Sequence, residues 1–174
     1  LAKTMIQDIY DTTGITATAG IGTNLFLTKV ALDITAKHAP DNMGYLDEDL
    51  FKQMLWHHTP LTDFWMIGGG TERRLATLGI KDLYDLAHYP EGYLYKTFGV
   101  NAEYLIDHAW GKEPTGIADI KAYKPASKSI SNSQILFEDY CYEDAYIVMK
   151  EMVDANVLTL TERHLVTKDR KSTR

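Results

Sequence analysis

The stretch "TATAGIGTNLFLTKVALDITAK", Thr16 to Lys37, predicts a strand that passes at once into a helix. Small and β-branched residues from Ile15 onward are typical of a short strand, and Gly22 closes it. The apolar residues that follow have the i, i+3, i+4, i+7 spacing of an amphipathic helix: Leu27, Val30, Ala31 and Ile34. We therefore expect a strand–helix unit joined by a small glycine-containing turn.

The neighbouring segments give this unit its boundaries. The helix is expected over 25–36, with Thr23 or Asn24 as its N-terminal cap. Residues 1–13 predict a preceding helix that stops at Gly14. A short strand at "YL" is expected after the loop "HAPDNMG".

A different pattern begins near Asp47, where short helices alternate with glycine turns as far as Gly111. Within it, "MIGGGTERRLATLGI", Met66 to Ile80, predicts a turn of three glycines followed by a helix from Thr71. Gly79 is expected to end that helix. "FGVNAEYLIDHAWG" repeats the layout about thirty residues later.

Two helices joined by a glycine turn suggest a helix-hairpin-helix site for a phosphate. The first amide groups of a helix lack partners within it and lie at the positive end of its dipole. Glycine has no side chain to keep an anion away, so a phosphate of DNA could bind there without being read for sequence. The candidate residues are Gly68, Gly69, Gly70, Thr71 and Arg73. The alternative is a flexible turn in a helical bundle, with Arg73 and Lys81 simply solvated.

The remaining third of the chain starts with a polar, proline-containing segment expected to be a linker. "SISNSQILFED" predicts a strand, and "YEDAYIVMKEMVDANV" predicts an amphipathic helix. The C-terminus is basic, and is either a DNA contact or an exposed end: Arg163, Lys168, Arg170, Lys171 and Arg174.

The composition is that of a globular chain, with 174 residues, 45% hydrophobic and 24% charged. Its net charge of −6 argues against a wholly basic nucleic-acid-binding domain but permits a local basic stripe. A single cysteine, Cys141, forms no internal disulfide, and no apolar run is long enough for a membrane span, so a cytoplasmic protein is expected. His57 and His58 are adjacent and cannot share one helical face, so no metal site is expected there.

Taken together, these motifs resemble the Y-family translesion DNA polymerases, the UmuC/DinB-like group (ImpB/MucB/SamB). The quoted strand and helix are similar to that family's palm segment, with a Gly-Ile-Gly turn at Gly20–Gly22 and an Ala-Lys pair at Ala36 and Lys37. The glycine hairpin resembles the thumb motif Gly-Ile-Gly-x-x-Thr followed by Leu-Gly-Ile. Gly68 and Gly70 are matched to its two glycines, which leaves Gly69 as a departure with no explanation.

The resemblance implies an α+β fold in several domains. The expected divisions are the end of the palm at 1–46, an all-α helix-hairpin-helix thumb at 47–113, a linker at 114–127 and part of an α+β little finger at 128–174. The chain does not begin with Met and stops within "TKDRKSTR", so a piece of a longer polypeptide is expected.

The resemblance also implies a function, namely template-directed nucleotide addition opposite damaged bases in DNA repair and the SOS response. The family's metal-binding carboxylates lie upstream of the matched segment, so no catalytic or metal-binding residue is expected here and this chain alone is expected to be inactive. Mg²⁺, an incoming dNTP, primer–template DNA and a sliding clamp are the partners implied for an intact enzyme.

Three further residues take their roles from the resemblance. Lys37 is matched to the lysine that contacts the nucleotide triphosphate, whereas Lys128 and Ser129 open a strand that runs along DNA. Spacing alone favours a different role for Lys37, because Lys29, Asp33 and Lys37 are four apart and could form ion pairs on one helix face.

Two other functions remain open. A non-catalytic helix-hairpin-helix DNA-binding module would use the same hairpin but has no need of the strand–helix unit. A hairpin-type DNA glycosylase would place a lysine near the hairpin, where this chain has Thr71 and Glu72.

Overall fold

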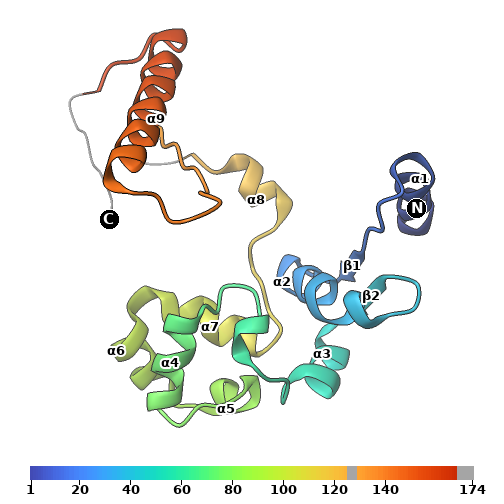
Figure 1. Ribbon diagram of the computed structural model, residues 1–174. Coiled ribbons are helices and arrows are strands. Elements are labelled where there is room, and N and C mark those ends of the chain that lie inside the picture. Colours follow the sequence, from blue (N-terminus) through green and yellow to red (C-terminus); the bar gives the residue numbers. More distant parts are fainter. Residues whose placement is uncertain (125–128, 168–174) are drawn as a thin grey trace. The chain divides into compact units, whose positions relative to one another are not determined.

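The computed structural model describes residues 1–124 and 129–167, which fall into two compact units divided after Tyr123 (Figure 1). The first unit holds a small parallel sheet and most of the helices. The described residues of the second include a long helix. The elements are α1 (Ala2–Thr13), β1 (Ala19–Gly22), α2 (Leu25–Val30), η1 (Ala31–Thr35), η2 (Ala36–His38), β2 (Met43–Leu46), α3 (Glu48–Leu55), η3 (Leu61–Asp63), α4 (Gly69–Thr77), α5 (Leu83–His88), α6 (Glu91–Phe98), η4 (Gly99–Asn101), α7 (Ala102–Ala109), α8 (Ile117–Ala122) and α9 (Tyr142–Glu162).

The sheet consists of β1 and β2, which run parallel with Gly20 opposite Gly44. Both strands were expected, but β1 begins at Ala19 rather than at Ile15. The physical reason is that a strand needs a neighbour to take its backbone hydrogen bonds, and β2 offers only four residues. The α+β mixture of the expected fold class is present in this first unit.

The helix expected over 25–36 is continuous but changes its winding. Asn24 caps it by accepting a hydrogen bond from the amide of Leu27 at 2.8 Å. After α2 the chain follows a π-helical turn, η1, in which the amide of Ala36 bonds to the carbonyl of Ala31, and it ends in the 3₁₀ turn η2.

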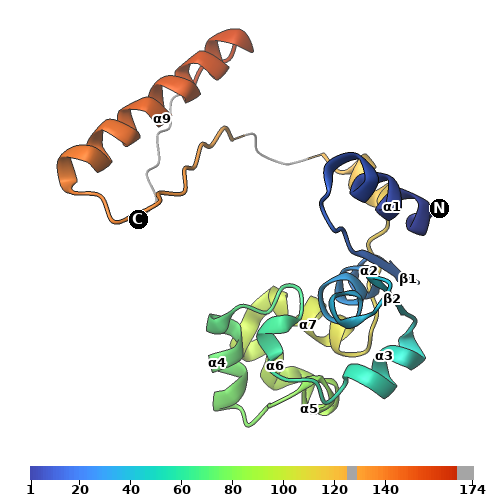
Figure 2. The same cartoon turned by 45° about the vertical axis from the view of Figure 1, so that its right-hand side comes forward.

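This helix lies directly against the sheet, as both views show (Figure 2). A Cβ atom at Gly20 would stand 2.3 Å from the carbonyl oxygen of Thr28, and one at Gly44 would stand 2.2 Å from the hydroxyl of Thr35. A Cβ at Gly22 would be equally crowded, 2.4 Å from the amide nitrogen of Thr28. Only glycine fits at these three positions, and the glycines allow the helix backbone to touch the strands.

The five short helices of the region expected at 47–111 are α3 to α7, with caps that the sequence indicates. Asp47 and Asp82 accept hydrogen bonds from the first turns of α3 and α5. Gly79 has a φ of 81° after α4, and the amide of Ile80 bonds back to Leu75 across it. The sheet, its helix and these helices share one apolar core, whose largest fully buried side chains include Phe26, Phe51 and Phe64.

Beyond residue 113 one expectation fails and another gains detail. The segment expected to be a linker contains the short helix α8, and its role as a linker stays a prediction. The strand expected at "SISNSQILFED" is wrong, because residues 129–141 have no regular structure in the described part of the chain. A β-strand requires a partner strand, and the described residues of this unit supply none. The expected helix is present as α9 but extends to Glu162.

None of the described helices is long and apolar enough to cross a membrane.

Crowding at Gly44 predicts the effect of a single methyl group. We expect Gly44→Ala to lower the free energy of unfolding by about 1–3 kcal/mol or more, because the added Cβ overlaps Thr35 and the backbone of Ala31. Gly92→Ala in α6 is the matched control. Nothing lies within 4 Å of its Cβ, so alanine should stabilise by up to about 1 kcal/mol. Urea unfolding followed by circular dichroism measures both, and equal stabilities would contradict the crowding.

Candidate nucleic-acid interface

The first hairpin comprises η3, a tip at residues 64–68, and α4. Its tip is anchored from inside, because Phe64 and Ile67 are only 2% and 7% exposed. The amide of Ile67 also donates to the carbonyl of Phe64 at 3.1 Å. The tip is therefore a defined turn, held by the core beneath it, and not a loose loop.

The helix after the tip begins two residues earlier than expected. α4 starts at Gly69, and not at Thr71, with Gly68 as an N-cap that makes no side-chain hydrogen bond. Glycine is acceptable at a cap and costs little in a first turn, which explains the earlier start. In the part of the chain that the structure describes, the amides of Gly69, Gly70 and Thr71 have no hydrogen-bond partner, and the first backbone bond is from Glu72 to Gly68. These three donors meet the requirement for an anion contact.

The glycine run has no explanation in the packing of the protein itself. Positive φ values occur at Gly14, Gly79, Gly99 and Gly111, and not at any of the three hairpin glycines. A Cβ at Gly68 or Gly70 would have nothing within 4 Å, and one at Gly69 would meet only the end of Arg73 at 3.5 Å. The space above them is therefore open.

The left-handed residue of the tip is Met66, with φ of 73°. This finding changes the match to the motif Gly-Ile-Gly-x-x-Thr. Ile67, Gly68 and Thr71 fit the specified residues among its last five positions, so Met66, and not Gly68, stands where the first glycine is expected. Gly69 then falls on an unspecified position of the motif, which removes the puzzle that it presented.

The two arginines of α4 have different environments. The guanidinium of Arg74 donates to the carbonyl of Thr97 and lies 4.5 Å from the ring centre of Phe98, so it ties α4 to the end of α6. Arg73 is exposed, and no ion pair involves it among the described residues. Sequence reasoning missed the role of Arg74, since two adjacent arginines look alike until their neighbours are known.

The second hairpin is formed by α6, η4 and α7. Gly99 has a φ of 62°, and Val100 at its tip is 84% exposed. The contact through Arg74 holds this hairpin beside the first.

Lys37 lies in η2 and is exposed. The ion-pair interpretation holds for Lys29, whose ammonium is 2.9 Å from Asp33, whereas no ion pair involves Lys37 in the described residues. Lys37 therefore has a free ammonium group at the end of its helix.

A largely buried hydrogen-bonded pair contacts the hairpin tip, and sequence reasoning did not find it. His108 on α7 is 5% exposed and its Nε2 is 2.9 Å from a carboxylate oxygen of Glu113. Its ring stacks on Phe26 of α2 with centroids 4.0 Å apart, and on Trp65 of the hairpin tip at 6.0 Å. One side chain thus joins the strand–helix unit to the tip.

The pKa of Glu113 is lowered. Burial acts to raise it, but the hydrogen bonds from His108 and from the backbone and side chain of Thr115 outweigh that effect because they favour the charged carboxylate.

The remaining residues considered as site residues give less support for a nucleic-acid interface. His57 pairs with Asp82 and His58 pairs with Asp63, each at 2.7 Å. Lys128 and the basic residues from 168 onward lie outside the described residues, whereas Ser129 is exposed in an irregular segment. Within residues 1–124 and 129–167, no three His, Cys, Asp or Glu side chains are grouped as metal ligands.

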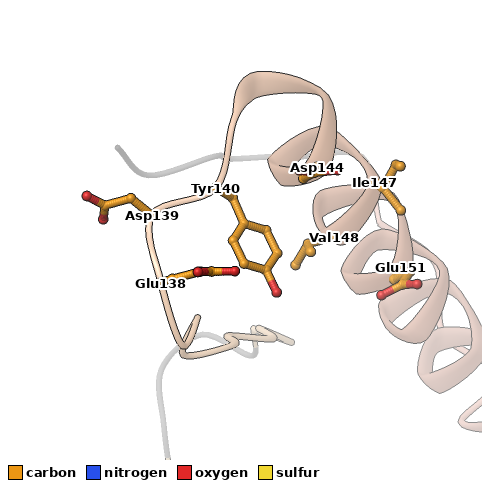
Figure 3. Close-up of a pocket in the computed structure, with 7 residues that line it drawn as sticks. All are labelled: Glu138, Asp139, Tyr140, Asp144, Ile147, Val148 and Glu151. Atoms are coloured by element: carbon orange, nitrogen blue, oxygen red, sulfur yellow. The ribbon is translucent and has the colours of Figure 1, made fainter.

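The second unit has a shallow pocket of its own, between residues 138–140 and α9 (Figure 3). Tyr140 reaches from the loop toward Val148 of the helix. Four of the lining side chains are carboxylates: Glu138, Asp139, Asp144 and Glu151. Their charge opposes the approach of a phosphate, which makes this pocket a poor candidate for a nucleic-acid contact.

Several known proteins are similar to this chain in sequence and fold, although no family model matches it. It is 34% identical over 141 residues to the DNA repair protein homolog YobH of Bacillus subtilis, which covers 80% of this chain and 64% of that protein. The putative UV-damage repair protein UvrX of Bacillus subtilis is 33% identical over the same share of the chain but over only 33% of its own length. DNA polymerase IV of Shewanella woodyi is 29% identical over 88% of this chain and 40% of its own.

Solved structures of DNA polymerases are also similar to this chain. A DinB family error-prone DNA polymerase from Sulfolobus solfataricus superimposes with a TM-score of 0.54 and 28% identity over 66% of this chain and 34% of that one. An insertion ternary complex of Dbh DNA polymerase superimposes with a TM-score of 0.53 and 26% identity. The match covers 67% of this chain and 33% of that one. All of these similar proteins are named as DNA polymerases or DNA repair proteins, and this is the class of protein that the chain resembles. More particularly, the chain is a relative of the Y-family DNA polymerases, and it spans less than two-thirds of the length of each protein compared.

The left-handed backbone of Met66 makes a prediction about stability. We expect Met66→Gly to raise the free energy of unfolding by about 0.5–1 kcal/mol, because glycine relieves a strain that exceeds the entropy it adds to the unfolded chain. Met54→Gly in α3 is the control, since it should cost about 1 kcal/mol in an ordinary helix. A loss of stability in both variants would contradict the strain at Met66.

The lowered pKa of Glu113 predicts how acid affects stability. A carboxyl with a lowered folded-state pKa stabilises the protein above its ordinary pKa, and that stabilisation disappears as the pH falls through the folded value. Glu113→Gln should therefore have a lower free energy of unfolding than the unmodified chain at neutral pH. The difference between the two should become smaller at about pH 3. Urea unfolding at the two pH values measures this difference. A difference in free energy of unfolding that stays constant or increases in acid would contradict the lowered pKa of Glu113.

Proposed function

We propose that this chain is the DNA-binding part of an error-prone, lesion-bypass DNA polymerase. The observation that carries the proposal is the turn at Gly68–Thr71, where three amides lack hydrogen-bond partners and the Cβ positions of the glycines are open. Backbone donors at a helix start bind phosphate without reading base sequence, which suits a polymerase that must hold any duplex.

The strand–helix unit favours a polymerase over a simple binding module. A helix-hairpin-helix module needs only the helices α3 to α7, whereas this chain also builds a glycine-packed sheet and helix on the same core. We propose that 1–46 is the end of a palm, 47–113 a thumb, 114–127 a linker and 128–174 part of a little finger. The likeness to DinB and Dbh polymerases supports this division.

In an intact enzyme, Lys37 would contact the triphosphate of the incoming dNTP with its free ammonium, and Arg73 would contact the DNA backbone beside the amides. Ser129 and Lys128 are proposed as further DNA contacts. A bound Mg²⁺ would supply charge stabilisation for nucleotide transfer, and none of the described residues is assigned to hold it. A cytoplasmic location, a role in the SOS response and a sliding clamp as partner complete the proposal.

The test places a negative charge at the proposed phosphate site. We expect Gly68→Asp and Gly70→Asp to weaken binding of a fluorescent primer–template about tenfold, because a carboxylate repels the phosphate. An acidic residue suits the first turn of a helix, so the fold should be kept. Fluorescence anisotropy over a salt series measures the affinity.

Gly92→Asp is the matched control. Gly92 is the second residue of α6, as Gly70 is of α4, and its Cβ site is also open. It should bind DNA as the unmodified chain does. Unchanged affinity in both hairpin variants, or an equal loss in the control, would remove the hairpin from the binding site.

A further inference from the structure

The tip of the first hairpin carries two large apolar side chains that the core does not cover. Trp65 is 41% exposed and Met66 is 48% exposed, although the residues on either side of them, Phe64 and Ile67, are buried. Trp65 is therefore only partly buried in the core. Its ring stacks on His108, and the exposed part of the side chain faces solvent.

Met66 holds its exposed position at a cost. Its φ of 73° is a conformation that glycine adopts freely and a side-chain-bearing residue adopts with strain. The buried neighbours and the hydrogen bond from Ile67 to Phe64 keep the turn in place. The chain thus has a flexible apolar side chain at a point where glycine would be easier to accommodate, and strain of this kind clusters at binding sites.

The surroundings suit a polyanion. No charged side chain occurs from Phe64 to Thr71, and the exposed Arg73 follows two residues later. Two carboxylates flank this segment: Asp63, which pairs with His58, and Glu72. The three free amides start only three residues after Met66. A strand whose phosphate binds those amides would bring its sugar next to the tip.

We propose that Trp65 and Met66 form an apolar wedge that packs against the deoxyribose edge of the DNA strand held at α4. The inference rests on the proposed function and adds the chemistry of the contact. Apolar side chains inserted at the minor-groove face bind sugars and base edges of any sequence. Because the wedge carries no charge, its contribution should not depend on salt, unlike that of the amides and Arg73.

The test uses Met66→Gly and Met66→Ala in the whole 174-residue chain with a fluorescent primer–template. We expect both variants to bind about five- to tenfold more weakly at every salt concentration, with the slope of affinity against salt unchanged. Met66→Gly should also raise the melting temperature, so its weaker binding could not come from a damaged fold. Met54→Ala, which shortens an exposed methionine on α3, should bind as the unmodified chain does.

The outcomes separate the wedge from the function on which it rests. If Gly70→Asp weakens binding but the Met66 variants match Met54→Ala, the wedge is overturned and the phosphate site stands. If the Met66 variants instead abolish self-association of the chain in sedimentation and leave DNA affinity unchanged, the tip is a contact between copies and the wedge is again overturned. If neither hairpin aspartate weakens binding, the proposed function fails first.

Discussion

The fold depends on the close approach of the helix at residues 25–38 to the two strands beneath it. Three glycines, Gly20, Gly22 and Gly44, present bare backbone to that helix, and a methyl group at any of them would overlap its atoms. The contact fixes the strand register, since Gly20 and Gly44 must lie opposite each other to face the same helix. The π-helical turn at Ala31–Thr35 lies where the helix passes Gly44. Because protein interiors are close-packed, the position of this helix determines the positions of the elements that pack on it.

The helical part of the first unit is joined to that helix by polar contacts and close packing at the end of α7. Asn24 caps α2 and also donates to the carbonyl of Gly111, while the indole of Trp56 donates to Ala109. Gly111 packs its backbone on Phe51, and its φ of 75° suits glycine. The buried pair of His108 and Glu113 lies at the same place, with its ring between Phe26 and the hairpin tip. The proposed phosphate site is thereby held at a set position on the strand–helix unit.

Sequence patterns predicted the elements of this site better than its details. Caps, glycines and apolar spacing are local signals, so most of the helices, both strands and the two hairpins could be predicted from them, whereas α8 was missed. The strand expected after residue 128 failed because a strand is not a local property and the pattern cannot supply its partner. The start of α4 and the left-handed residue of its tip were also missed. Three consecutive glycines make the position of a turn ambiguous, and burial of Phe64 and Ile67 resolves it.

The sequence by itself determined that this chain folds as a glycine-turn strand–helix unit followed by short helices with glycine hairpins, and it determined the likeness to the Y-family polymerases. Only the tertiary structure decided which groups act. Arg74 contacts the second hairpin, whereas Arg73 has no ion pair among the described residues. Lys29 pairs with Asp33, whereas Lys37 has no such partner there. His108 is buried and bonds to Glu113. The physical reason is that identical residue types acquire different roles from neighbours distant in sequence, and those neighbours exist only once the core has packed.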